Sequence, residues 1–150
     1  MTQEDKELLL KVICAMLPYG VKAQVTGWDE EKGEVKVPLK IYSINTDGYV
    51  YFETNDYDVN YLPIEACRLY LRPMSSMTEE EKDELRQEQI KDEQLFADCI
   101  KNHPEMRGLI IPHFAADWCD KNMFDYRGLI PKGLAIPVTK DYNPYKQETK

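Results

Sequence analysis

The chain has 150 residues and a formal net charge of −8, and its hydrophobic content of 43% is that of a globular protein with a buried core. It contains no apolar run of about 18 residues, which excludes a membrane-spanning helix, and a chain this acidic is poorly suited to binding nucleic-acid phosphates. The acidic start MTQEDKELLL lacks the basic residues of a secretory signal, so we expect a soluble cytoplasmic protein.

Apolar residues recur at helical spacing at the start of the chain. Thr2 is suited to cap the N-terminus of a helix, and Pro18 would end that helix. The pattern predicts an amphipathic helix over residues 3–17, whose apolar stripe must pack on another element, most simply a sheet. The stripe consists of Leu8, Leu9, Val12, Ile13, Met16 and Leu17.

The following segment, up to residue 73, has the pattern of strands. VKAQVTGW, GEVKVPLKIYSI and GYVYFET alternate apolar and polar side chains, and the turn sequences DEEKG and NTDG separate them. YDVNYLPIEACRLYLRP then predicts two short strands with one helical turn at residues 63–67 between them. We expect a small antiparallel sheet, which would form a half-open barrel if it curled.

Residues 74–150 change in character. Thr78 and Glu81 match a capping box, and the helix that they predict over residues 78–102 carries nine acidic and four basic residues. A last helix is expected over about residues 112–122, and the polar tail from Val138 should be frayed. The apolar contacts of the long helix should come mainly from its second half; its apolar residues are Leu85, Ile90, Leu95, Phe96 and Ile100.

These elements predict an α+β fold. An N-terminal helix would pack on the small antiparallel sheet, and a two-helix C-terminal half would follow. We expect a single compact domain over residues 1–150, with one sub-lobe of helix and sheet at 1–73 and a mainly helical sub-lobe at 74–150.

Aromatic side chains on the predicted sheet are the first candidates for a binding surface. Tyrosines are enriched at interfaces because they combine a large apolar ring with a polar tip, although they also close ordinary half-exposed sheets. Tyr49, Tyr51 and Tyr57 would lie there, with Trp28 at the edge. An anionic ligand would also need a cation. The candidates for that role are Arg68, Arg72 and Arg127.

Catalytic and metal sites have weaker signals. His113 and Asp117 stand four residues apart on a predicted helix, a spacing that allows acid–base work but also an ordinary surface pair. A zinc site would draw its ligands from the set Cys99, His103, His113 and Cys119, but the spacing is irregular, and buried thiols with loop histidines explain the set equally well. The sequence lacks a phosphate-binding glycine loop and the motifs GxSxG and HExxH. We therefore expect no cofactor and assign no catalytic residues.

Three blocks, LPYGVK, YLRPMSSMTEEEK and FDYRGLIPKGLA, frame most of the chain. Together they resemble an uncharacterised family of small proteins of gut anaerobic bacteria, their prophages and phages. The resemblance implies a mobile-element setting, in which small accessory proteins bind host proteins or capture small defence signals. It implies no catalytic residues. From its own residues, the third block should fold the C-terminus back, with Arg127 paired to Asp125 or a helix carboxylate. The side chains expected to be buried by it are Phe124, Tyr126, Leu129, Ile130 and Leu134.

Three functions remain open from the sequence. The first is a non-catalytic binding or interaction protein of phage or prophage origin, which would use the tyrosine-bearing sheet or a cleft between the two halves. The second is a protein that sequesters a nucleotide signal and so counters host defence, with an arginine or lysine in an aromatic pocket. The third is an enzyme centred on His113 and Asp117.

Overall fold

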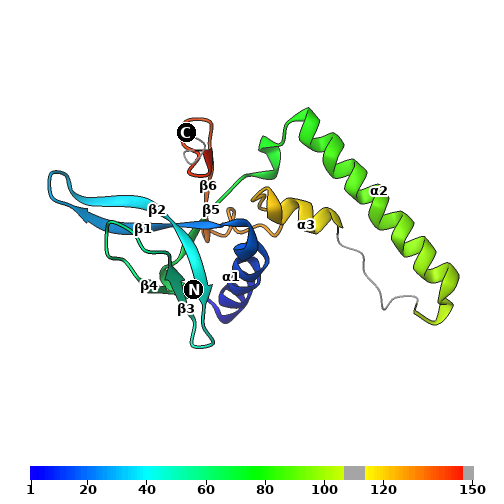
Figure 1. Ribbon diagram of the computed structural model, residues 1–150, viewed down its shortest axis with the longest axis horizontal. Coiled ribbons are helices and arrows are strands. Elements are labelled where there is room, and N and C mark those ends of the chain that lie inside the picture. The colour runs from blue at the N-terminus through cyan, green and yellow to red at the C-terminus, as the bar shows by residue number, and fades with distance from the viewer. Residues whose placement is uncertain (107–113, 147–150) are drawn as a thin grey trace.

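The computed structural model describes residues 1–106 and 114–146, and it confirms the predicted α+β fold. A long helix, α2, stands apart from a sheet that carries the first helix (Figure 1). Short 3-10 turns are labelled η. In chain order the elements are α1 (Gln3–Met16), η1 (Leu17–Tyr19), β1 (Lys22–Asp29), β2 (Gly33–Ile44), β3 (Tyr49–Phe52), β4 (Tyr61–Pro63), η2 (Ile64–Ala66), β5 (Arg68–Leu71), η3 (Met74–Ser76), α2 (Glu79–Asn102), η4 (Pro104–Met106), α3 (Phe114–Lys121) and β6 (Ala135–Pro137).

The sheet has six strands in the order β4-β3-β2-β1-β5-β6. Neighbouring strands run antiparallel except β5 and β6, which pair in parallel from Leu69 opposite Ala135 to Leu71 opposite Pro137. The sheet is open, with β4 and β6 at its two edges. Strand β6 comes from the C-terminal half and was not predicted, because three residues ending in proline are too short to show a strand periodicity.

One hydrophobic core joins α1 to the sheet and to the C-terminal segment. Leu9, Val12, Ile13 and Met16 of the predicted stripe are buried there, and Leu8 and Leu17 are partly buried against them. Thr2 caps the helix as predicted, and with Asp5 it forms a capping box. The C-terminal segment adds Leu129 and Leu134 to the same core. The fully buried side chains of this core are Leu9, Val12, Ile13, Met16, Val21, Val25, Val50, Leu69, Leu71 and Leu129.

The segment after α3 folds back on the end of β5, as the third sequence block predicted. The Arg72 amide donates to the Met123 carbonyl at 2.7 Å, and the Arg72 carbonyl accepts from the Asp125 amide at 2.9 Å. The buried Asp125 carboxylate then accepts from the amides of Leu129 and Ile130 at 2.7 and 2.9 Å. These bonds hold the turn that carries Leu129 into the core.

The polar tail is ordered through residue 146, so the prediction of fraying is wrong there. The Tyr145 hydroxyl donates to the Tyr70 carbonyl at 2.6 Å and accepts from the Lys22 amide at 3.1 Å. The Lys22 ammonium donates to the Pro144 carbonyl at 3.1 Å, and Pro144 is fully buried. The composition of the tail did not predict this docking, because the contacts come from Pro144 and Tyr145 within an otherwise hydrophilic stretch.

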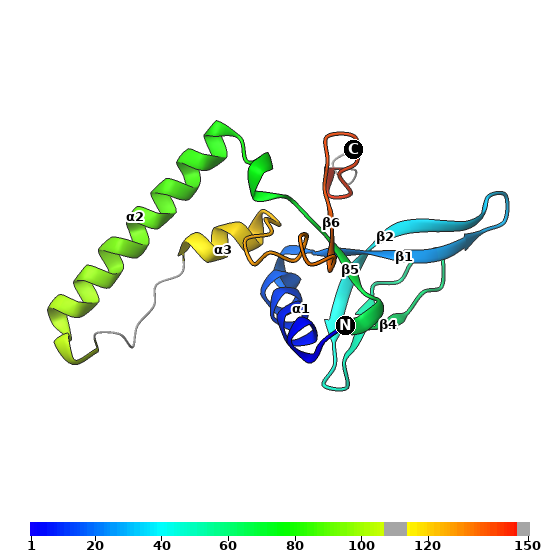
Figure 2. The same ribbon diagram turned by 180° about the vertical axis from the view of Figure 1, so that it is seen from behind.

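Helix α2 extends away from the sheet in both views (Figures 1 and 2). Its capping box of Thr78 and Glu81 is present, but no residue of the helix is buried. In its first half Leu85 packs near Phe124, and in its second half the Asp92 carboxylate accepts from the amides of Phe114 and Ala115 at 2.6 and 3.0 Å. The prediction that the second half makes the apolar contacts is wrong: Ile90, Leu95 and Phe96 are exposed. Among the described residues, no helix is long and apolar enough to cross a membrane.

Candidate functional site

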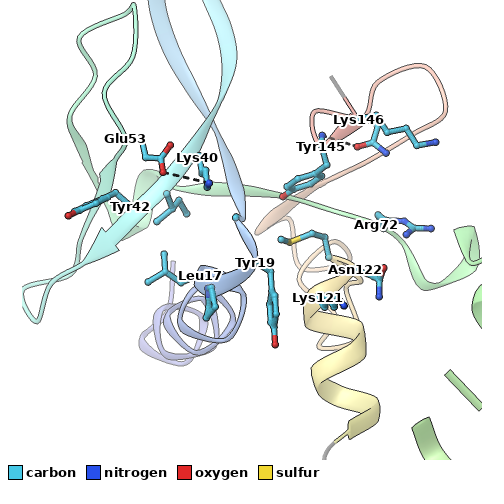
Figure 3. Close-up of a pocket in the computed structure, with 15 residues that line it drawn as sticks. Leu17, Tyr19, Lys40, Tyr42, Glu53, Arg72, Lys121, Asn122, Tyr145 and Lys146 are labelled. Carbon is cyan, nitrogen blue, oxygen red and sulfur yellow. Dashed lines mark hydrogen bonds and ion pairs between the residues drawn. The ribbon is translucent and has the colours of Figure 1, made fainter. Parts of the chain in front are cut away.

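A groove of about 720 Å³ opens between the sheet with α1 on one side and α3 with the tail on the other (Figure 3). Its walls come from segments far apart in the sequence. We call it the basic groove; the described residues that line it are Leu17, Pro18, Tyr19, Gly20, Lys40, Ile41, Tyr42, Glu53, Arg72, Lys121, Asn122, Met123, Asn143, Tyr145 and Lys146.

Cationic side chains dominate the ionisable lining of the basic groove. Lys40, Arg72, Lys121 and Lys146 face a single carboxylate, Glu53. This balance is opposite in sign to the net charge of −8 on the whole chain. A concave surface with one sign of charge focuses the electrostatic potential and attracts ions of the opposite sign. The groove is therefore built to attract anions.

The four cations differ in how far neighbouring carboxylates compensate them. The Arg72 guanidinium donates to both carboxylate oxygens of Glu81 at 2.7 Å, so its charge is largely neutralised. The Lys40 ammonium lies 3.7 Å from a Glu53 oxygen, and both side chains are about half exposed, so that pair is weak. Lys121 and Lys146 are exposed. Lys40 and Lys121 thus contribute more to the groove's attraction for anions than Arg72 does.

The turn that follows Tyr19 lies close to the Lys40 side chain. Tyr19 ends η1 and is 43% exposed, and the next residue, Gly20, turns the chain into β1 with φ of 81°. A Cβ atom at Gly20 would lie 3.3 Å from the Cε atom of Lys40. The glycine therefore provides both the left-handed turn and the space in which the Lys40 side chain crosses it.

A second exposed ring stands on the sheet side of the groove. The β2–β3 pairing shifts register between Ile41 and Ser43, and Tyr42 lies at that irregularity with 69% of its surface exposed. Ile41 faces the core and Tyr42 points away from it (Figure 3). A bulge of this kind re-aims a side chain. The Tyr42 ring points away from the other labelled residues of the groove, so Tyr19 is the exposed ring that lies among them (Figure 3).

Of the binding residues predicted from the sequence, only Arg72 lines the basic groove. Trp28 is 71% exposed near the β1–β2 turn. Tyr49 and Tyr51 each lie within 6 Å of the Tyr61 ring, at centroid distances of 5.6 and 5.8 Å, and form a separate cluster on β3 and β4. The structure does not bring these aromatic residues together with Arg72.

Three other predicted residues have structural partners. The Tyr57 ring packs on Gly27 of β1, where a Cβ atom would come within 2.7 Å of it. One Arg68 nitrogen donates to the carbonyls of Glu65 and Cys67 at 3.0 and 2.9 Å. Arg127 donates to Asp120 of α3 at 3.2 Å, which is the predicted pairing with a helix carboxylate. These contacts stabilise turns and loops.

The residues that sequence reasoning missed are Tyr19, Lys40, Lys121 and Lys146. They lie on a 3-10 turn, a strand, a helix end and the tail, and no short motif joins them. The block LPYGVK contains Tyr19 and was the only signal near any of them.

The cysteines do not form a reactive centre in the described residues. Burial raises the pKa of the Cys67 thiol to about 12 and, with the nearby Asp120 carboxylate, that of Cys119 to about 11. At neutral pH these side chains are almost entirely protonated, and a thiol is a poor nucleophile and metal ligand compared with a thiolate. Both residues therefore behave as small core side chains.

The proposed zinc ligands are only partly described, because His113 lies outside the described residues. The Trp118 indole donates to Glu84, so Cys119 lies across from the first half of α2. Cys99 is fifteen residues beyond Glu84, about 22 Å along a helix that rises 1.5 Å per residue, and cannot share an ion with Cys119. Within residues 1–106 and 114–146, no three His, Cys, Asp or Glu side chains gather as a metal site.

The enzyme hypothesis also involves His113, so its pairing with Asp117 is not described. Asp117 itself is exposed on α3. It does not line the basic groove.

A second groove of about 430 Å³ lies between α1 and the β2–β3 turn. Leu10, Cys14 and Ile64 contribute to its lining, and its one lysine, Lys6, pairs with Glu65 at 2.7 Å. It lacks the converging cations of the basic groove, and we do not assign it a ligand.

The chain matches no protein-family model, no curated protein and no solved structure.

Proposed function

We propose that this protein is a non-catalytic binding protein that takes an anionic ligand into the basic groove. One observation carries the proposal: Lys40, Arg72, Lys121 and Lys146 converge on one concavity of a chain whose net charge is −8. Charges of like sign repel, so gathering them in one groove lowers the stability of the unliganded fold. An anion bound there would relieve this repulsion.

Binding fits the lining better than catalysis does. The described lining residues include no histidine, cysteine or serine. Its one carboxylate, Glu53, is paired with Lys40. General acid–base or nucleophilic catalysis needs a group poised to exchange a proton or attack a substrate, commonly next to a second group that orients it. Lysines and amides instead suit the recognition of a charged group, so the enzyme hypothesis has no support from this groove.

Calorimetric titration with tripolyphosphate, a polyanion without a ring, tests the proposal. We expect saturable binding that weakens as salt is added, because salt screens exposed charges. Lys121→Gln and Lys40→Gln should each weaken binding by about tenfold, the range for a hydrogen bond to a charged group. Lys36→Gln, which removes an exposed lysine on β2 outside the groove, is the matched control. Absence of binding, or equal losses in all three variants, would contradict the proposal.

A protein partner is the second candidate, and the exposed aromatic residues of the sheet favour it. Trp28 is the most exposed large hydrophobic side chain described, and Tyr49 and Tyr61 form a separate exposed cluster on β3 and β4. Tryptophan and tyrosine dominate the binding energy of many protein interfaces. Affinity purification that recovers one identified protein with the wild type, but loses it with Trp28→Ala or Tyr61→Ala, would support this function. Equal recovery with all three proteins would contradict it.

The setting of the protein is part of the same proposal. The three sequence blocks resemble proteins of gut anaerobes, their prophages and phages, and this resemblance supports a mobile-element protein that acts in the cytoplasm. In that setting, a groove for a small anion would serve to capture a signalling molecule. The genes beside this one on its source genome test the setting: phage or prophage genes are expected, and a stable metabolic operon would contradict it.

A further inference from the structure

We infer that the ligand of the basic groove is a nucleotide: a phosphate group held by the lysines and a planar base stacked on Tyr19. This inference rests on the proposed anion-binding function and specifies the ligand class. Tyr19 lines the groove and is 43% exposed, so part of its side chain is accessible to a ligand.

The backbone that carries Tyr19 is also held in place before any ligand arrives. Its backbone belongs to η1, in which Pro18 fixes one dihedral angle and the Gly20 amide donates to the Leu17 carbonyl at 3.3 Å. A rigid aromatic platform gains more from stacking than a mobile one, because less entropy is lost on binding. Stacking of a base on an aromatic side chain tolerates any base, since every base has a π face.

The cations lie within reach of the same ring. In Figure 3 Tyr19 lies between Lys40 on the sheet side and Lys121 at the end of α3. The Lys40 side chain crosses the turn at Gly20, the residue after Tyr19, with its Nζ atom 3.8 Å from the position of a Cβ on Gly20. A ligand stacked on Tyr19 can therefore place its phosphates against lysines on either side. Lysine binds phosphate as a point charge without a fixed geometry.

Size and polarity agree with a ligand larger than a simple inorganic anion. The groove volume of about 720 Å³ lies within the range of about 300 to 1,000 Å³ typical of small-molecule sites. The amides of Asn122 and Asn143 line it as well, and an amide can donate to and accept from a sugar or a base edge. The Asn122 amide also donates to the Trp118 carbonyl and the Asn143 oxygen also accepts from the Tyr145 amide, so each has one further polar atom for a ligand. A bare phosphate would not contact the Tyr19 ring.

The rest of the molecule favours a mononucleotide over a nucleic-acid strand. A strand would continue past the groove and would need further basic residues along its path. The helix α2 carries an excess of carboxylates, including Glu79, Glu80 and Glu81 in its first turn, close to Arg72 at the groove's edge. Those charges repel further phosphates.

The test compares three probes by calorimetry on the full-length protein: ATP, tripolyphosphate and adenosine. We expect ATP to bind about tenfold more tightly than tripolyphosphate, because only ATP adds a stacked base, and adenosine to bind weakly because it lacks phosphates. Tyr19→Leu should remove the advantage of ATP and leave tripolyphosphate binding unchanged. Tyr19→Phe should keep the advantage, and Tyr61→Leu, an exposed tyrosine outside the groove, should have no effect.

The other outcomes distinguish a failure of the nucleotide inference from a failure of the proposed anion binding. Equal affinity for ATP and tripolyphosphate would overturn the nucleotide inference while leaving anion binding intact, and so would a Tyr19→Leu protein that retains the preference for ATP. No binding of any probe would contradict both proposals. Tighter binding of a single-stranded thymidine oligonucleotide than of ATP would overturn the mononucleotide in favour of a strand. Circular dichroism of each variant confirms that a change in affinity does not reflect unfolding.

Discussion

The guanidinium of Arg72 donates two hydrogen bonds of 2.7 Å to the two carboxylate oxygens of Glu81. The same carboxylate accepts from the Thr78 amide at 3.0 Å and so completes the N-terminal cap of α2. The guanidinium also lies 4.0 Å from the centre of the Phe124 ring. This one pair therefore joins the end of β5, the start of α2 and the returning C-terminal segment.

Breaking this pair should lower the free energy of unfolding. Glu81→Gln removes a charged partner from a site where both side chains are less than a quarter exposed, and we expect a loss of about 1 to 2 kcal/mol by urea denaturation. Arg72→Lys should lose a similar amount, because an ammonium cannot make the two parallel bonds. The double variant should lose less than the sum of the two, since both changes remove one interaction. As control, Lys82→Gln in an exposed pair with Glu79 should change stability by less than about 0.5 kcal/mol.

The pair also predicts a dependence of stability on pH. The Arg72 hydrogen bonds hold the pKa of Glu81 below its ordinary value of 4.5, and the Thr78 amide lowers it further. A carboxylate with a depressed pKa in the folded state stabilises the fold at pH above its unfolded pKa, and that contribution is lost as the pH falls through the folded value. The gap in stability between wild type and Glu81→Gln should therefore be full near neutral pH and shrink below about pH 4. A gap that grows on acidification would contradict this assignment.

The N-terminal ends of α1 and α2 could be predicted because the capping residues lie close together in the sequence. Thr2 with Asp5, and Thr78 with Glu81, identify the two caps within four residues of sequence. The contacts of α2 could not be predicted in the same way. Hydrophobicity favoured apolar contacts in its second half, whereas the contacts found depend largely on polar groups that meet residues distant in the chain, as Glu81 meets Arg72 and Asp92 meets the start of α3.

The tail docking should contribute measurably to stability. Tyr145→Phe removes the hydroxyl that bonds the Tyr70 carbonyl and the Lys22 amide, leaving both without that partner. We expect a loss of about 1 to 3 kcal/mol in thermal or urea unfolding, the range for a buried hydrogen bond left incomplete. Tyr61→Phe, at a mostly exposed ring, is the control and should be neutral. An unchanged Tyr145→Phe protein would mean that the tail does not hold its position.

The return of the C-terminal segment to the core predicts a larger effect. Leu129 is fully buried against the core, and Leu129→Ala should cost about 2 to 5 kcal/mol through lost burial and the cavity left behind. Leu95→Ala on the exposed part of α2 should cost less than about 0.5 kcal/mol. Equal effects of the two substitutions would show that the segment does not pack as described.

The candidate site could be predicted only in outline. The sequence indicated that an anionic ligand would need a cation beside aromatic rings, and Arg72 does line the groove. The rings and most of the cations came from elsewhere: Tyr19 from a turn, Lys40 from a strand and Lys121 from the end of a helix. Their proximity follows from tertiary packing, which no spacing along one segment encodes.

The central claim, that the basic groove binds anions, is tested most directly by mapping tripolyphosphate binding with amide chemical shifts. The account predicts saturable shifts that cluster in four segments separated along the chain but adjacent at the groove: residues 19–20, 40–42, 121–123 and 143–146. Shifts that instead gather at Arg68 and Arg127, or no shifts at all, would contradict it.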